Sequence, residues 1–365
     1  MNICERDVLI WLNAIGIANY NISKFADAFP DLLDLWYCKR RDLEKLNIFN
    51  TALIDKLFKN KNEDSLKRVL HDIDVKEIKV VTFLDEEYPS HLIHINDKPN
   101  VIYMKGHIYK SDDMSISIVG SRKSTSYGRW ATEKICKELV EIGITIVSGL
   151  ASGVDTIAHR TALENDGRTI AVLGTGIDRI YPSKNKGLYK DVTESGAVIT
   201  EFPLDTEPFA YNFPQRNRII SGISLGTVII EAQEKSGSLI TASHASNQGK
   251  DVFAVPGNIN SLFSRGTNKL IKDGARPLLE IDDILEEIYE FRELKNKMTV
   301  KAKVNPDDFS QTEIKVINCI EKQPIHCDEI SYKTGINISE LNSILTILEL
   351  KGIIKETSSR VFAIY

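Results

Sequence analysis

The chain has 365 residues, of which 42% are hydrophobic, and its formal net charge is −5 at pH 7. A chain of this length and composition can bury a sizeable core and is expected to divide into more than one domain. The acidic balance excludes a global positive field that would draw the whole molecule onto nucleic acid or acidic lipid. Any binding of anions must therefore depend on a local cluster of cations.

The five cysteines are scattered along the chain without the spacing of a zinc site or a redox motif. This pattern predicts reduced thiols in a cytoplasmic protein and indicates no zinc site. No metal and no cofactor are expected. Glu5 and Asp7 precede any apolar run, and no apolar stretch is long enough to cross a bilayer. Secretion and a membrane partner are therefore not expected.

Residues 1–75 are predicted to form a small helical domain, because apolar residues recur there at helical spacing. The segment Asn13–Ile17 contains Gly16 and is predicted to turn between two short helices. Two interpretations of this region remain open. It forms either a helix-hairpin-helix element, whose turn amides face a DNA phosphate, or a helical cap that does not contact DNA.

Residues 76–290 alternate short apolar strands with helical segments, and right-handed crossovers between such strands produce a parallel sheet. The predicted fold class is α/β, with an extended Rossmann-like, doubly wound, mostly parallel sheet between a small helical N-terminal domain and a winged-helix C-terminal domain. The strands of the predicted sheet include residues 115–119, 144–149, 169–174, 197–202, 227–232 and 251–255.

Residues 291–307 are predicted to be a charged linker, and residues 308–365 a winged-helix domain. Ser339 is expected to cap its last helix, which runs to Leu350. Residues 308–365 hold six Lys or Arg against eight Asp or Glu, a net charge of −2. Because a DNA-reading winged helix normally carries basic residues, a protein-contact or structural role is favoured over DNA reading, which stays open.

Loops of small residues follow three of the predicted strands, at residues 119–125, 148–155 and 174–178. Small residues let a backbone approach a ligand closely, and helix N-terminal amides then point at it. Arg122 adds a fork-shaped donor that matches phosphate geometry. The loops contain neither the glycine spacing of a dinucleotide site nor a P-loop.

Cations in two further segments are expected to join these loops. Gln215–Arg218 holds two arginines, and Lys235–Ser238 begins with a lysine. Because the carboxyl ends of parallel strands meet at one edge of a sheet, Arg122, Arg216, Arg218 and Lys235 are predicted to converge on one anion-binding crevice.

Six motifs in this order resemble the DNA-processing protein A (Smf) family of bacteria: VGSRKSTSYG, SGLASGVDTIAH, AVLGTGIDRIYP, FPQRNRIISG, EAQEKSGSLITA and FAVPG. The resemblance covers roughly residues 78–290 and extends more loosely to both terminal domains. It implies a protein that binds and protects single-stranded DNA and helps to load the RecA recombinase onto it during natural transformation. It also implies a homodimer without turnover chemistry.

The resemblance further implies which residues contact the DNA. Bases would be accommodated near Gly174, Gly176 and Tyr181. The residues that would bind the DNA backbone are Gly120, Ser121, Arg122, Ser148, Gly149, Arg216, Asn217, Arg218, Lys235, Ser236 and Gly237.

Aromatic residues within the motifs are candidates for stacking on bases. Tyr181, on a glycine-rich loop, is the preferred candidate, whereas Phe213 is expected to belong to the core.

Two other classes of function are compatible with the same topology. A nucleotide-hydrolysing enzyme would need carboxylates beside a ribose, and Glu201, Glu231 and Asp155 lie near predicted strand ends. Glu231 is the most plausible of these, although it could instead hold an arginine of the 215–218 segment. A nucleotide-sensing scaffold without DNA binding is the third class.

Overall fold

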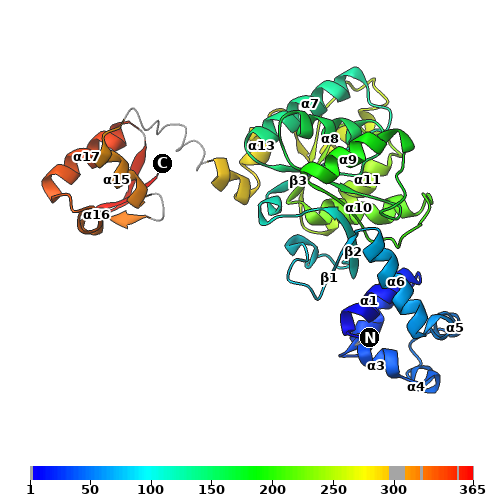
Figure 1. Ribbon diagram of the computed structural model, residues 1–365. Helices are drawn as coiled ribbons and strands as arrows, with labels where there is room; N and C mark the ends of the chain where they lie inside the picture. The colour runs from blue at the N-terminus through cyan, green and yellow to red at the C-terminus, as the bar shows by residue number, and fades with distance from the viewer. Residues whose placement is uncertain (1–2, 296–308, 321–323, 352, 365) are drawn as a thin grey trace. The chain divides into compact units, whose positions relative to one another are not determined.

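The computed structural model describes residues 3–295, 309–320, 324–351 and 353–364, and the chain divides into two compact units after Ile284 (Figure 1). Among these residues, the first unit contains the N-terminal helices and a nine-stranded sheet. The second contains a smaller group of helices with a three-stranded sheet.

The strands of the large sheet are, in chain order, β1 (Lys79–Thr82), β2 (Val101–Gly106), β3 (Ser115–Val119), β4 (Thr145–Ser148), β5 (Thr169–Val172), β6 (Ala197–Thr200), β7 (Gly226–Ile229), β8 (Asp251–Ala254) and β9 (Arg276–Pro277). They lie side by side in the order β1-β2-β6-β5-β4-β3-β7-β8-β9. All neighbours from β6 to β9 are parallel, and β2 pairs antiparallel with both β1 and β6. This arrangement confirms the predicted α/β class and the mostly parallel sheet.

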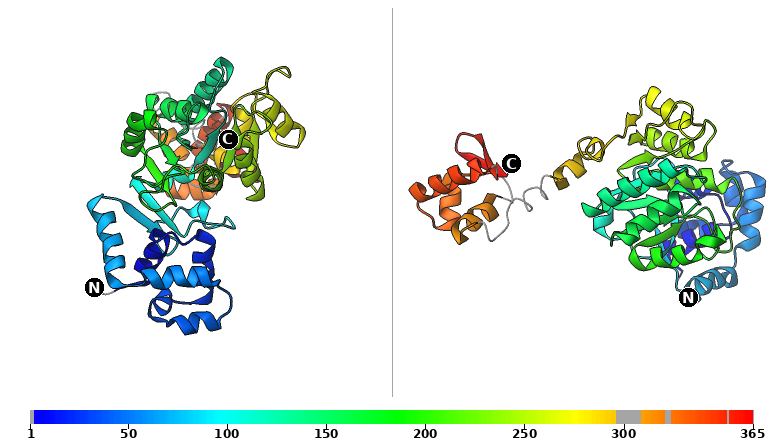
Figure 2. Two further views of the ribbon diagram at one scale, coloured as in Figure 1. Left: turned by 90° about the vertical axis from the view of Figure 1, so that its right-hand side faces the viewer. Right: turned by 90° about the horizontal axis from the view of Figure 1, so that it is seen from above.

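The helices that connect the parallel strands are α7 (Ser126–Glu141), α8 (Val154–Glu164), α9 (Lys186–Ser195), α10 (Asn212–Ile223), α11 (Gly237–Asn247) and α12 (Arg265–Lys272). Helices α7, α8 and α9 pack side by side on one face, and α10 and α11 pack together on the opposite face (Figure 1 and Figure 2). The sheet is therefore doubly wound, as predicted. Shorter helical segments are η1 (Ser90–Leu92), η2 (Lys110–Asp113), η3 (Ser183–Asn185) and α13 (Asp282–Leu285).

The strand order reverses between β3 and β7. From β3 the chain proceeds to β4, β5 and β6 on one side, and α10 then carries it back across the sheet to β7 on the other side. The connections that leave β3 and β7 diverge to opposite faces. In open α/β sheets, such a switch point leaves a crevice at the carboxyl ends of the strands.

Strand β3 is buried on both faces although its sequence alternates serine with isoleucine. Burial of a hydroxyl is costly unless it forms a hydrogen bond. The Ser117 Oγ lies 2.7 Å from the Thr227 Oγ1, and the Ser115 Oγ donates to the Ile223 carbonyl at 3.2 Å. The serines thus bond β3 to the β7 side of the sheet, where the switch point lies.

The N-terminal helices are α1 (Glu5–Ala14), α2 (Asn19–Ala28), α3 (Leu32–Tyr37), α4 (Arg40–Lys45), α5 (Thr51–Asn60) and α6 (Glu63–Val75). Their core includes Trp11 and Trp36, whose rings meet edge to face at 4.9 Å. The Asn13 side chain joins this group to the sheet, because it donates to the Glu201 carbonyl at 3.1 Å and accepts from the Tyr103 hydroxyl at 2.9 Å.

The turn between α1 and α2 favours the interpretation of this region as a cap on the sheet. Gly16, with φ of +76°, donates its amide to the Asn13 carbonyl at 2.8 Å, and Ile17 donates to Leu12 at 3.1 Å. These two turn amides are therefore already bonded within the chain. A helix-hairpin-helix element would need such amides to face a phosphate.

The second unit has the predicted winged-helix arrangement, with α15 (Gln311–Ile320), β10 (Ile325–His326), α16 (Cys327–Thr334), α17 (Ile338–Leu350), β11 (Ile354–Ser358) and β12 (Val361–Ile364). Its strands lie in the order β10-β12-β11. The predicted cap at Ser339 is wrong: the side chain of Asn337, two residues earlier, accepts from the Glu340 amide at 2.9 Å. Residues 296–307 of the predicted linker lie outside the described residues.

None of the helices in the described ranges combines the length and apolar character needed to cross a membrane.

A histidine is fully buried between α8 and the sheet. His159 accepts the Leu150 amide on Nε2 at 3.3 Å, and its Nδ1 lies 2.7 Å from the Thr169 Oγ1, which donates to the Ile146 carbonyl at 2.8 Å. This chain of bonds fits a neutral ring with its proton on Nδ1. Burial lowers the pKa of His159 to about 3.

This depressed pKa predicts that stability falls as the pH drops below about 6.5, the ordinary pKa of histidine. At a pH between the pKa of His159 in the folded chain and its ordinary value, the unfolded chain binds a proton that the folded chain does not. The free energy of unfolding should therefore fall by roughly 2 kcal/mol from about pH 7.5 to about pH 5. Urea unfolding at a series of pH values measures this slope. His159→Gln keeps an acceptor and does not titrate, so the slope above about pH 5 should flatten in this variant; an unchanged slope would assign it to other groups.

Candidate nucleic-acid interface

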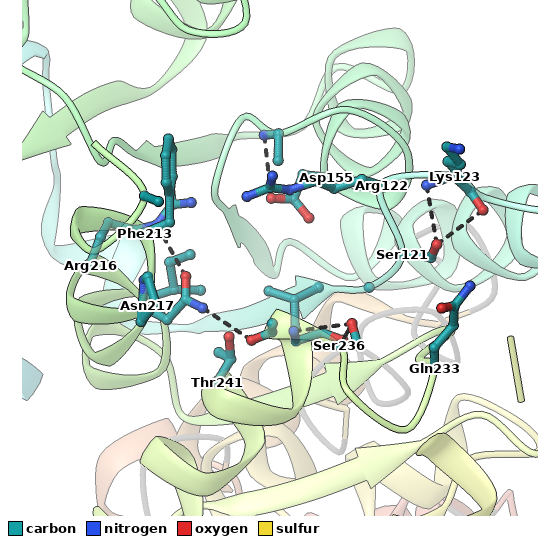
Figure 3. A pocket seen from close by; sticks show the side chains of 18 of the residues that line it. Ser121, Arg122, Lys123, Asp155, Phe213, Arg216, Asn217, Gln233, Ser236 and Thr241 are labelled. Carbon is teal, nitrogen blue, oxygen red and sulfur yellow. Dashed lines mark hydrogen bonds between the residues drawn. The ribbon is translucent and has the colours of Figure 1, made fainter. Parts of the chain in front are cut away.

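A pocket of about 570 Å³ opens at the switch point of the sheet. It is lined by the loop after β3, the start of α8, the start of α10 and the loop from β7 into α11. In Figure 3, Ser121 and Lys123 lie on one side of the cavity, Phe213 and Asn217 on the other, and Ser236 below them. The predicted crevice at the carboxyl edge of the sheet is therefore present.

Gly153 allows the loops after β3 and β4 to pack against each other. Its φ of +79° lies in the left-handed region, and a Cβ there would lie 2.2 Å from the carbonyl oxygen of Ser121. The next residue, Val154, donates its amide to the same oxygen at 3.1 Å. Only glycine satisfies both demands, and the contact fixes the loop after β3 against the N-terminus of α8.

Helices α8 and α11 both begin at the wall of the pocket, where Ala151, Asp155, Ser236 and Gly237 line it. The Ser236 Oγ caps α11 by accepting from the Ser238 amide at 3.3 Å. Helix N-termini carry partial positive charge and unpaired amides, which favour a bound anion.

Two exposed cations follow β3 and line the pocket. Arg122 and Lys123 form no ion pair with any carboxylate in the described part of the chain. The Arg122 guanidinium carbon lies 5.3 Å from the centroid of the Phe213 ring, which provides a cation–π contact. Both charges therefore remain available to a ligand.

Arg216 also lines the pocket but is only 3% exposed. Its Nη1 donates to the carbonyls of Gly149, at 2.7 Å, and Val172. Burial lowers the pKa of Arg216 to about 10, with Asp155 opposing the shift. Asp155 accepts the Gly149 amide at 3.2 Å and the Ala151 amide at 3.4 Å, and burial raises its pKa. These two residues hold the ends of β4 and β5 together and form the floor of the pocket.

The prediction that four cations converge in the crevice is wrong for Lys235, which is exposed outside the pocket, and for Arg218. This side chain is 5% exposed and does not line the pocket. It makes a bidentate contact with Glu201 at 2.5 and 2.8 Å, and its Nε donates to Asp97 Oδ2 at 3.0 Å. Arg218 therefore ties α10 to the end of β6 and to the loop before β2, and burial makes this pair strongly interdependent.

The strand-end carboxylates also have structural partners. Glu231 does not hold an arginine of the 215–218 segment: it accepts the Thr125 amide at 3.0 Å and the Thr125 hydroxyl at 2.5 Å. Thr125 in turn caps α7. Among the described residues, Asp155 is the acidic side chain that lines the pocket.

Phe213 is not a core residue, contrary to expectation. It is half-buried, lines the pocket and lies against Gly174, where an added Cβ would meet its ring at 2.8 Å. Tyr181 is 45% exposed, and its ring centroid lies 5.6 Å from that of Phe213. Gly176 lies away from the pocket, where its amide donates to the Thr206 carbonyl at 3.0 Å.

The structure thus brings half of the predicted site residues into one pocket. Ser148 is not among them, because its hydroxyl is buried and donates to the Ile118 carbonyl at 2.6 Å. Sequence reasoning missed Lys123, Gln233 and Thr241, of which Lys123 carried a signal as the cation next to Arg122. The predicted residues that line the pocket are Gly120, Ser121, Arg122, Arg216, Asn217, Ser236 and Gly237; those that do not are Ser148, Gly149, Gly174, Gly176, Tyr181, Arg218 and Lys235.

The two kinds of arginine predict different effects on stability. Arg218→Met should lower the free energy of unfolding by about 3–5 kcal/mol, because it leaves Glu201 buried without its partner. Arg122→Ala should change it by no more than about 0.5 kcal/mol, because that side chain is exposed. Denaturant unfolding of both variants beside the wild type measures the difference, and similar small effects would contradict a structural role for Arg218.

Comparisons with known proteins show which family this chain resembles. A family model described as DNA recombination-mediator protein A matches residues 79–289, and one described as DprA winged helix domain matches residues 300–358. Protein Smf of Synechocystis sp. is 30% identical over 95% of this chain and 96% of its own length.

Two solved structures superpose on part of this chain. DNA processing protein A from Streptococcus pneumoniae superposes with a TM-score of 0.69 and 33% identity, covering 79% of this chain and 99% of its own. The protein from Helicobacter pylori, described for its single-stranded DNA binding mode, has a TM-score of 0.52 and 30% identity, covering 57% and 94%. The chain therefore belongs to the DNA recombination-mediator protein A family.

Proposed function

We propose that the pocket binds the backbone of single-stranded DNA. The observation that carries this proposal is the pair of exposed cations, Arg122 and Lys123, beside the N-termini of α8 and α11. Binding of single strands without sequence preference needs a cationic groove that follows phosphates and rings on which bases can stack. Phe213 and Tyr181 supply such rings, and the similarity to the single-stranded DNA-binding protein of Helicobacter pylori supports the assignment.

Within this proposal the pocket residues have distinct roles. Arg122 and Lys123 pair with phosphates, and the amides near Ser121 and Gly237 donate to phosphate oxygens. Asn217 bridges α10 to α11, because its amide donates to the Gly237 carbonyl at 3.3 Å. Lys235 is exposed next to the pocket-lining residues of its loop, and we assign it to a phosphate outside the pocket.

We further propose that the protein is a cytoplasmic homodimer that protects the bound strand and helps to load RecA onto it during natural transformation. Membership of the family supports this role. In this proposal residues 76–290 bind DNA, residues 1–75 cap that domain, and the acidic winged-helix domain, residues 308–365, contacts protein.

We propose binding without turnover. Glu201 and Glu231 are engaged with Arg218 and Thr125, so neither carboxylate points at a ligand in the pocket. Asp155 accepts two backbone amides beneath Arg216 and thereby serves the floor of the site. Fixed hydrogen bonds of this kind suit a structural carboxylate better than one that exchanges a proton with substrate.

The proposal predicts a preference for single-stranded over duplex DNA with little dependence on sequence. Three exposed cations should give a slope of log K against log salt concentration of about −2. Fluorescence anisotropy with labelled oligo-dT and a matching duplex, over a series of salt concentrations, measures both quantities. Equal or tighter binding of the duplex, or a flat salt response, would contradict the proposed site.

Arg122→Ala should weaken the binding of oligo-dT about 10-fold or more, because a charged hydrogen bond to phosphate contributes about 1.5–3 kcal/mol. Arg129→Ala is the matched control, since Arg129 is an exposed arginine on α7 that does not line the pocket. Its affinity should equal that of the wild type. RecA filament growth on the same strand should fall with Arg122→Ala alone. Equal losses in both variants would mean that binding follows overall charge rather than this pocket.

A further inference from the structure

An exposed pair of stacked aromatic rings lies next to the pocket. Phe209 and Tyr211 are 49% and 69% exposed, their ring centroids are 5.5 Å apart, and their planes differ by 4°. They belong to the loop between β6 and α10. Single exposed apolar side chains are common on protein surfaces, but two parallel rings form a flat apolar face that can receive another flat group.

This pair is continuous with the pocket. Ala210, between the two aromatic residues, lines the pocket, and so does Phe213, two residues after Tyr211. The Tyr181 ring lies beside the Phe213 ring, with 5.6 Å between their centroids. A strand held at its phosphates near Arg122 would therefore find the rings of Phe213 and Tyr181 and those of the pair along one edge of the pocket.

The loop that carries the pair is held by hydrogen bonds. The Asn212 side chain donates to the Gly174 carbonyl at 3.1 Å, and the backbone amide of Asn212 donates to the Phe209 carbonyl at 3.0 Å. The Phe209 amide donates to the Glu207 carbonyl at 2.8 Å. Because the backbone on both sides of the pair is bonded, a ligand that stacks there need not order the loop first.

The charges around the pair favour an uncharged ligand group. Asp205 and Glu207 precede Phe209 in the same loop, and Arg179 lies 3.1 Å from Asp205 and 3.6 Å from Glu207. Lys76 also lies 3.9 Å from Asp205, so both cations of this set already have carboxylate partners. A phosphate would meet no unpaired cation in this set, whereas the face of a base would meet only ring surface.

We propose that Phe209 and Tyr211 form a base-stacking platform for nucleotides of the single strand that extend beyond the pocket. This inference rests on the proposed function, because the pocket must first hold the phosphates. The platform lengthens the binding site and gives it an apolar contribution to affinity that does not depend on salt. It also directs the bases toward the loop between β6 and α10 and the phosphates toward the loop after β3.

The test separates bases from phosphates. Phe209→Ala/Tyr211→Ala is titrated with oligo-dT and with an abasic oligonucleotide of the same length, which keeps the phosphates and lacks the bases. Stacking on aromatic side chains contributes substantially to the binding of each base, so the affinity for oligo-dT should fall about 10-fold or more. The affinity for the abasic strand should stay within about twofold of that of the wild type.

Two further variants serve as controls. Phe209→Tyr/Tyr211→Phe keeps both rings and should bind oligo-dT like the wild type. Trp130→Ala removes an exposed ring that stacks on Tyr127 at 5.9 Å and does not line the pocket, so it should also bind like the wild type. Thermal melting of each variant verifies that the fold is retained.

Three results would overturn the platform. The alanine double variant would bind oligo-dT as the wild type does, or it would lose affinity equally for the abasic strand, or Trp130→Ala would lose as much affinity. In the first case a loss with Arg122→Ala would leave the proposed function intact. Failure of the wild type to bind oligo-dT would instead reject the proposed function itself.

Discussion

The reversal of strand order between β3 and β7 determines where the proposed DNA-binding pocket lies. Because the connections that follow β3 and β7 leave toward opposite faces, a pocket stays open at the carboxyl ends of these two strands. Two helix N-termini border that space, and Gly153 lets the loops approach closely enough to shape it. The acidic chain thereby places two exposed cations, Arg122 and Lys123, at one edge of its sheet, although its net charge opposes binding to DNA.

The arginines of the site divide into two kinds. Arg216 and Arg218 are buried. Arg216 donates to backbone carbonyls and forms the floor of the pocket, whereas Arg218 donates to the Glu201 carboxylate and fixes the position of α10. Arg122 is exposed and forms no ion pair or hydrogen bond with a carboxylate among the described residues, although the charge of Asp155 attracts it, so its donors remain available to a phosphate. Burial of Arg216 and Arg218 costs desolvation energy and fixes the shape of the pocket, whereas the exposed Arg122 provides the attraction for a phosphate.

Much of the fold could be predicted from the sequence, because each parallel strand is a short apolar run followed by small residues. The location of the pocket followed from the same pattern. The partners of individual side chains could not be predicted from this pattern. Arg216 and Arg218 are two residues apart on one helix and face different partners, and those of Arg218, Asp97 and Glu201, are distant in the sequence. An apolar residue such as Phe213 is expected in the core. Only the tertiary structure shows that its ring lies against Gly174 and also lines the pocket.

Amide hydrogen exchange with and without oligo-dT tests the central claim most directly, because it reports which backbone amides the strand covers. The account predicts slower exchange in residues 120–125, at the starts of α8 and α11 and in the loop before α10, with unchanged exchange in residues 311–350. Protection confined to the winged helix or to the N-terminal helices, with the loops after β3 and β7 unaffected, would contradict it.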